Sequence, residues 1–187
     1  MRKLVLAAAL VALATPLHAQ SPAPATRPTG THATVSPTTK KFVDNAAMTD
    51  IFEIKAGQLA QQKAPDTAYK DFAQMTIEDH TKTTDQLKDM APKLGLELPQ
   101  QLDKMHQAAI DKLNSQSSAA FERLYKTDQV RGHREAVAMF ERYAKSGDNP
   151  DLKKWAADTL PTLRKHLQHA EALPRPAPAT TGTGTRK

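Results

Sequence analysis

A helical seam that carries a histidine among apolar side chains is the strongest constraint in this sequence. Between residues 73 and 94, one set of side chains recurs at steps of four and three, which is the spacing of a helix face packed against a core. Its members are Ala73, Ile77, His80, Thr84, Leu87, Ala91 and Leu94. The pattern recurs at His133, between Val130 and Val137, and at His166, between Leu163 and Ala170. The chain therefore repeats one polar interruption on three helices.

The periodicity predicts an all-α fold built from four long helices. They are expected at about residues 39–63, 66–94, 118–146 and 150–173, with Asp66 and Asn149 as N-caps. A further helix at about residues 100–114 lies in the connection between the second and third long helices. Because this connection is long enough to return along the bundle, we expect a ferritin-like four-helix bundle. The alternative is an up-down bundle with the extra helix packed on one end.

The two ends of the chain differ from the helical block. Residues 1–19 have a basic start, a short apolar run and a small residue before the expected cut after Ala19. These features predict a cleavable signal peptide and export to a periplasm. Residues 20–38 and 174–187 are rich in Pro, Thr and Ala, which predicts a disordered linker and tail around one bundle domain at residues 39–173. No other apolar stretch is long enough to span a membrane.

Composition and charge exclude several classes of function. The chain has no cysteine, which excludes thiolate metal sites and cysteine nucleophiles. Six of its 26 lysines and arginines and none of its 20 acidic residues lie outside residues 39–173, so the helical block is formally neutral. Nucleic-acid binding normally needs a basic face, and no nucleic-acid partner is expected. The sequence also lacks a phosphate-binding loop, a nucleophile elbow and a serine–histidine–aspartate arrangement.

Three histidines and one glutamate form the candidate site. Counted from the expected helix starts, Glu53, His80, His133 and His166 lie about 14, 14, 15 and 16 residues into their helices. Since each is near a helix midpoint, all four are expected at one level whichever way the helices run. Imidazole and carboxylate are ligands of zinc, copper, iron and manganese. The pattern thus predicts a site for one transition-metal ion.

A hydrogen-bonded polar layer is the alternative interpretation of these residues. A histidine on an apolar face is more often a satisfied core residue than a ligand, and such a layer can fix the register of a bundle. His80 has Thr76 and Asp79 as candidate partners, and His133 has Gln129. Two other positions are expected at the surface, namely His169 and the pair Asp103–His106.

Four regions of the block match the pattern of a known family. They are residues 42–64 with Glu53 to Ala60, Asp79 to Lys82, Asp128 to His133, and Leu160 to Leu163 followed by His166-Leu167. In these regions the chain resembles the exported bacterial family known as domain of unknown function 4142, which is grouped with ferritin-like bundles. The resemblance implies the fold and export, and it implies no activity.

A di-iron carboxylate centre is not expected despite the ferritin-like grouping. Di-iron members carry a glutamate three residues before a histidine on each of two helices. The residues three before the seam histidines are Ile77, Val130 and Leu163, none of which can bind a metal.

Together these observations favour a non-enzymatic, exported bundle protein of the cell envelope or of a stress response, with a His/Glu layer at its centre. One alternative is a bundle that binds a single transition-metal ion, and another is a histidine-based pH sensor. The sequence indicates neither a protein partner nor an oligomeric state.

Overall fold

The structure is a computed structural model that describes residues 35–176. These residues form five α-helices and one 3₁₀ helix and contain no strand. The helices are α1 (Pro37–Lys63), α2 (Thr67–Met90), η1 (Ala91–Leu94), α3 (Lys104–Asn114), α4 (Ser118–Ser146) and α5 (Pro150–Ala172). The expected signal peptide (1–19), most of the expected linker (20–38) and most of the expected tail (174–187) lie outside the described residues.

Side-chain caps account for where α1, α2, α3 and α5 begin. Asp66 and Asn149 cap α2 and α5 as predicted, and each accepts a hydrogen bond from a backbone N–H of the first turn. The first helix begins at Pro37, two residues earlier than expected, because the Ser36 hydroxyl accepts from Thr39 N at 3.0 Å. The connecting helix begins at Lys104, four residues later than expected, because Asp103 is its cap and accepts from His106 N at 2.8 Å.

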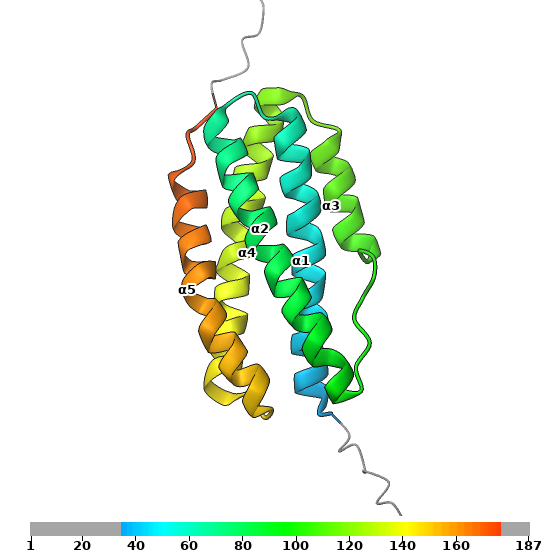
Figure 1. Ribbon diagram of the computed structural model, residues 1–187. Coiled ribbons are helices and arrows are strands. Elements are labelled where there is room, and N and C mark those ends of the chain that lie inside the picture. Colours follow the sequence, from blue (N-terminus) through cyan, green and yellow to red (C-terminus); the bar gives the residue numbers. More distant parts are fainter. Residues whose placement is uncertain (1–34, 177–187) are drawn as a thin grey trace, which may run out of the picture. The chain divides into compact units, whose positions relative to one another are not determined.

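The four long helices pack as two neighbouring hairpins, α1 with α2 and α4 with α5 (Figure 1). Helix α1 also contacts α4, and α2 also contacts α5, which closes the bundle. Figure 1 shows α1 and α5 running in one direction and α2 and α4 in the other. The connection from α2 to α4 returns along the bundle and includes α3, which packs on α1 and α4. A single long crossover of this kind is found in ferritin-like bundles. The predicted all-α four-helix bundle with an extra helix in this connection is confirmed.

The core consists of two separate hydrophobic clusters. One contains Phe42, Phe140 and Trp155, where α1 and α5 begin and α4 ends. The other contains Tyr69 and Tyr125 and lies toward the opposite ends of the helices. On every long helix, a buried polar segment separates the residues of the two clusters. These segments hold Asp50 and Glu53 on α1, Thr76 and His80 on α2, Gln129 and His133 on α4, and His166 on α5. We call this set the polar layer.

None of the helices within residues 35–176 combines the length and the apolar character that crossing a membrane requires.

Two helical glycines predict opposite effects of the same substitution. A Cβ at Gly57 would lie 2.7 Å from Ile77 Cγ1 and 3.2 Å from the Ala73 carbonyl oxygen, so α1 and α2 approach closely there. A Cβ at Gly132 would meet only Glu53 Oε1, at an ordinary 3.6 Å. We expect Gly132→Ala to raise the free energy of unfolding by up to about 1 kcal/mol, since alanine is the better helix former. We expect Gly57→Ala to lower it by about 1–3 kcal/mol through overpacking. Urea unfolding of both variants is the measurement, and equal gains in stability would contradict the close approach of α1 and α2.

Candidate metal centre

The polar layer brings three histidine rings from three helices together. His80 on α2, His133 on α4 and His166 on α5 are all buried, with no more than 3% of any residue exposed. Their ring centroids lie 5.8 Å (80–133), 5.5 Å (80–166) and 5.2 Å (133–166) apart. One ring nitrogen from each histidine lies within 4.8 Å of those from the other two. The three histidines therefore converge at one level, as the sequence predicts.

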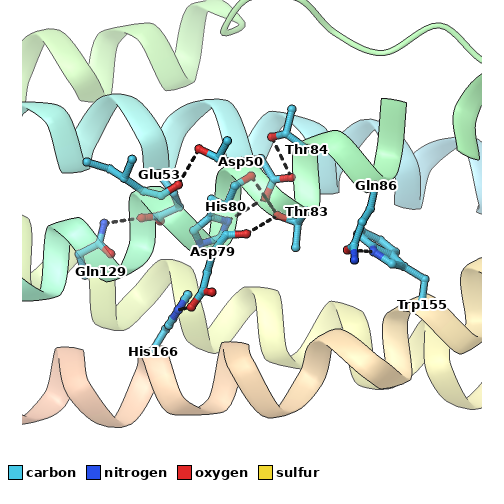
Figure 2. Close-up of polar contacts among 12 residues, drawn as sticks. Asp50, Glu53, Asp79, His80, Thr83, Thr84, Gln86, Gln129, Trp155 and His166 are labelled. Carbon is cyan, nitrogen blue, oxygen red and sulfur yellow. Dashed lines mark hydrogen bonds and ion pairs between the residues drawn. The ribbon is translucent and has the colours of Figure 1, made fainter. Parts of the chain in front are cut away.

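The other nitrogen of each ring is held by a hydrogen bond that points away from this centre. His80 Nδ1 lies 2.8 Å from Asp50 Oδ1 on α1, and His166 Nε2 lies 2.9 Å from Asp79 Oδ2 on α2 (Figure 2). His133 Nδ1 lies 3.0 Å from the Gln129 carbonyl oxygen, one turn earlier on α4. Two carboxylates and one backbone carbonyl thus fix the orientations of the rings.

These outward bonds determine which nitrogen of each neutral ring carries its hydrogen. A carbonyl oxygen only accepts, so His133 Nδ1 is the protonated nitrogen and Nε2 presents a lone pair. The carboxylates of Asp50 and Asp79 place the hydrogen in the same way on His80 Nδ1 and His166 Nε2. The nitrogens left to face one another are His80 Nε2, His133 Nε2 and His166 Nδ1. None of them has a hydrogen-bond partner among residues 35–176.

Burial and neighbouring charges set the protonation of the three rings. Burial lowers the pKa of His166 to about 4, and the charge on His80 adds to this effect and outweighs the bond from Asp79. Burial likewise lowers the pKa of His133, although the Glu53 charge opposes it. For His80 burial also acts downward, but the hydrogen bond and charge of Asp50 outweigh it and raise the pKa. His133 and His166 are therefore neutral at pH 7. A proton on the metal-free site belongs on His80 Nε2, and a cation that bound there would displace it.

Asp50 is the most important residue of the site that the sequence analysis missed. It is 4% exposed and accepts hydrogen bonds from His80 Nδ1, Thr83 Oγ1 and Thr84 Oγ1 (Figure 2). Burial raises the pKa of Asp50, although these hydrogen bonds act to lower it. Because the pKa of His80 is raised as well, the pair takes up a proton more readily than either group does in water. The signal was present in the sequence, because Asp50 lies at helical spacing from the buried Ala46, Ala47 and Glu53.

The partners expected for His80 are wrong. The Thr76 hydroxyl donates instead to the Ala73 carbonyl at 2.9 Å. Asp79 precedes His80 by one residue, so it lies about 100° further round the helix and faces α5, where it pairs with His166. The expected pairing of His133 with Gln129 is observed, through the backbone carbonyl of Gln129 rather than its side chain.

Glu53 is buried at the same level but lies outside the group of converging nitrogens. Its Oε2 accepts a hydrogen bond from Gln129 Nε2 at 2.7 Å (Figure 2). The remaining histidines of the described chain lie where the sequence placed them. His106 pairs with Asp103 at 2.8 Å on the bundle surface, and His169 is exposed.

Comparison with known proteins identifies the family of this chain. The family model described as "Domain of unknown function (DUF4142)" matches residues 23–173. The chain belongs to the DUF4142 family. A similar solved structure is the "Crystal structure of DUF305 fragment from Deinococcus radiodurans", with a TM-score of 0.65 and 16% identity over 74% of this chain and 95% of that chain. At this identity the likeness shows the fold alone. The comparison with curated proteins found no match.

The donor set of this DUF4142 chain fits a transition-metal ion. Three neutral imidazoles with outward hydrogen bonds to carboxylate or carbonyl groups are the usual surroundings of a histidine-bound metal. At a metal–nitrogen distance of about 2.0–2.1 Å, tetrahedral ligand nitrogens lie about 3.4 Å apart. Since the three nitrogens already lie within 4.8 Å of one another, each ring needs to move inward by less than about 1 Å.

The lowered pKa of His166 predicts that acid destabilises the metal-free DUF4142 bundle. Its folded pKa of about 4 lies below the unfolded value of about 6.5, so the unfolded chain binds more protons between these limits. The stabilising contribution is complete above pH 6.5 and is lost as the pH falls toward 4. Denaturant unfolding with chelator present, at pH 7 and pH 5, should show wild type losing roughly 1–2 kcal/mol more than His166→Gln. Equal losses in the two proteins would contradict a neutral, buried His166.

Proposed function

We propose that this chain binds one transition-metal ion through His80, His133 and His166. One observation carries the proposal, namely the convergence of three buried ring nitrogens whose lone pairs face a common centre. Three lone pairs at close range repel one another, and a cation placed between them attracts all three. The proposal is one of binding, and it assigns no catalytic residue.

The unpaired state of the three nitrogens favours a metal site over a hydrogen-bonded polar layer. In such a layer the buried groups would pair with one another, as Glu53 and Gln129 do. Leaving a buried acceptor without a partner costs about 1–3 kcal/mol per group. When all three rings are neutral, the bundle instead directs the hydrogen of each ring outward, which leaves three acceptors and no donor at the centre. This arrangement suits a cation and does not suit mutual hydrogen bonding.

The donor chemistry narrows the class of ion. Three imidazole nitrogens suit zinc, copper, iron and nickel, and oxygen-seeking ions such as calcium and magnesium prefer carboxylates. At equal availability, copper(II) should bind most tightly, because affinities for divalent ions rise along the first row to copper. Three protein ligands also leave a coordination position for water or another small ligand.

We also propose that the bundle acts after export to a periplasm. This is supported by residues 1–19, in which basic residues precede a short apolar run, as in a signal peptide. In that compartment a site built from histidine alone has no thiol that oxidation could inactivate.

Metal reconstitution tests the proposed function. The protein is stripped with a chelator, offered zinc, copper(II), iron(II) or manganese(II) separately, desalted, and analysed for bound metal. We expect one ion per chain for wild type, a loss of stoichiometric binding for His80→Ala with His133→Ala, and retention for His169→Ala. His169 is a matched control, because it is an exposed histidine three residues after His166 on α5. Circular dichroism establishes that each variant is folded. A wild-type protein without stoichiometric metal, or equal uptake by the double variant, would contradict the proposal.

Removing a carboxylate that holds a ligand ring should weaken metal binding without removing a ligand. Asp79→Ala deletes the acceptor for His166 Nε2 and frees that ring to rotate. We expect the dissociation constant to rise roughly 10–100-fold, as for other hydrogen-bond partners of metal ligands. Asp85→Ala is the control, because Asp85 lies on the same helix, is exposed and pairs with Lys88. Competition titrations against a chromogenic chelator give both constants, and identical values would show that Asp79 does not support the site.

A further inference from the structure

A pocket on one side of the bundle leads from the surface to the polar layer. It has a volume of about 670 Å³ and is bounded by residues of α1, α3 and α4. Its lining includes Glu53, His106, Asp128, Gly132 and Glu135. Glu53 is the buried member of this set, with 2% of its surface exposed, so it forms the inner end of the pocket.

Glu53 lies between this pocket and the three histidines. Its Oε2 is held by Gln129 Nε2 on the side of α4 that also carries His133. Its Oε1 lies toward Gly132, where the absence of a side chain leaves the carboxylate reachable from the pocket. The negative charge of Glu53 also acts on His80 and His133 in the direction that raises the pKa of each ring, although burial still lowers the pKa of His133. One carboxylate thus borders both the pocket and the histidine centre.

We propose that this pocket is the route by which a divalent metal cation reaches the three-histidine centre, with Glu53 as the carboxylate that receives the ion and passes it inward. This inference rests on the proposed function. An entering ion must exchange bound water for protein ligands, and a carboxylate at the inner end provides an oxygen ligand before the imidazoles are reached. Along the bundle axis an ion would instead have to pass the buried aromatic side chains of the two apolar clusters.

The rival route passes Asp79, which is partly exposed between α2 and α5. There the ring of His166 stands between the carboxylate and the centre, since Nε2 faces Asp79 and Nδ1 is left for the other two histidines. An ion that arrived at Asp79 would have to displace this ring. Glu53 is not hydrogen-bonded to a histidine ring in this way, because its partner within residues 35–176 is the side chain of Gln129.

The rates of metal uptake and release test this route. Glu53→Gln removes the charge and keeps an oxygen that accepts from Gln129, so the bundle should be preserved. Association of zinc with the full chain is followed by stopped flow with a fluorescent chelator, and release is followed by transfer to excess chelator. We expect association to slow roughly tenfold or more, the size of effect that a focused charge produces. Release should slow as well, so that the dissociation constant rises by less than the association rate falls.

Two further variants make the outcome specific. Glu122→Gln is the matched control, because Glu122 is also buried and accepts one hydrogen bond, from Asp66 N, but does not line the pocket. It should leave both rates unchanged. Gly132→Leu fills the inner end of the pocket with the charge intact and should slow both rates; if it does not fold, Glu53→Gln decides alone.

Each contrary result has a separate meaning. Wild type that binds no zinc overturns both the proposed function and this route. Normal zinc stoichiometry with unchanged rates in Glu53→Gln overturns the route and leaves the metal site standing.

Discussion

The hydrogen bond that each buried histidine makes away from the bundle centre is the interaction on which the site depends. Asp50, Asp79 and the Gln129 carbonyl take one nitrogen of each ring, and this fixes both the ring orientation and the position of its hydrogen. The other nitrogen of each neutral ring then faces the centre as a hydrogen-bond acceptor. If the outward partners were donors, the same three rings would present N–H groups to the centre and could not bind a cation.

The bundle supports this arrangement through the division of its core. Apolar clusters on both sides of the polar layer hold the four long helices in register and keep the histidines at one level. Because α2, α4 and α5 each supply one histidine, the three-histidine group forms only when both hairpins are packed together. One outward bond joins the two helices of a hairpin, because Asp50 on α1 holds His80 on α2. Another joins the two hairpins, because Asp79 on α2 holds His166 on α5. Metal binding should therefore stabilise the whole bundle rather than one helix.

Much of the fold and the three histidines could be predicted from periodicity, because apolar spacing, caps and helix length act locally along the chain. The depth of each histidine in its helix was sufficient to place His80, His133 and His166 at one level. The contacts across helices could not be derived in the same way. Asp50 was missed because its partner His80 lies on a neighbouring helix, and periodicity along the chain does not show which side chains meet across helices. Glu53 has the predicted depth, but its carboxylate turns to Gln129, a rotamer choice that depends on a neighbouring helix.

The central claim is that three imidazoles of one chain bind a single ion, and X-ray absorption spectroscopy of the zinc-loaded protein tests it directly. The spectrum should show the multiple-scattering signature of three imidazole ligands, with nitrogen at about 2.0–2.1 Å and one further light-atom ligand. Ring scattering from His80, His133 and His166 together would account for it, and His133→Ala should reduce the imidazole count by one. A first shell of oxygen atoms without imidazole scattering would contradict the claim.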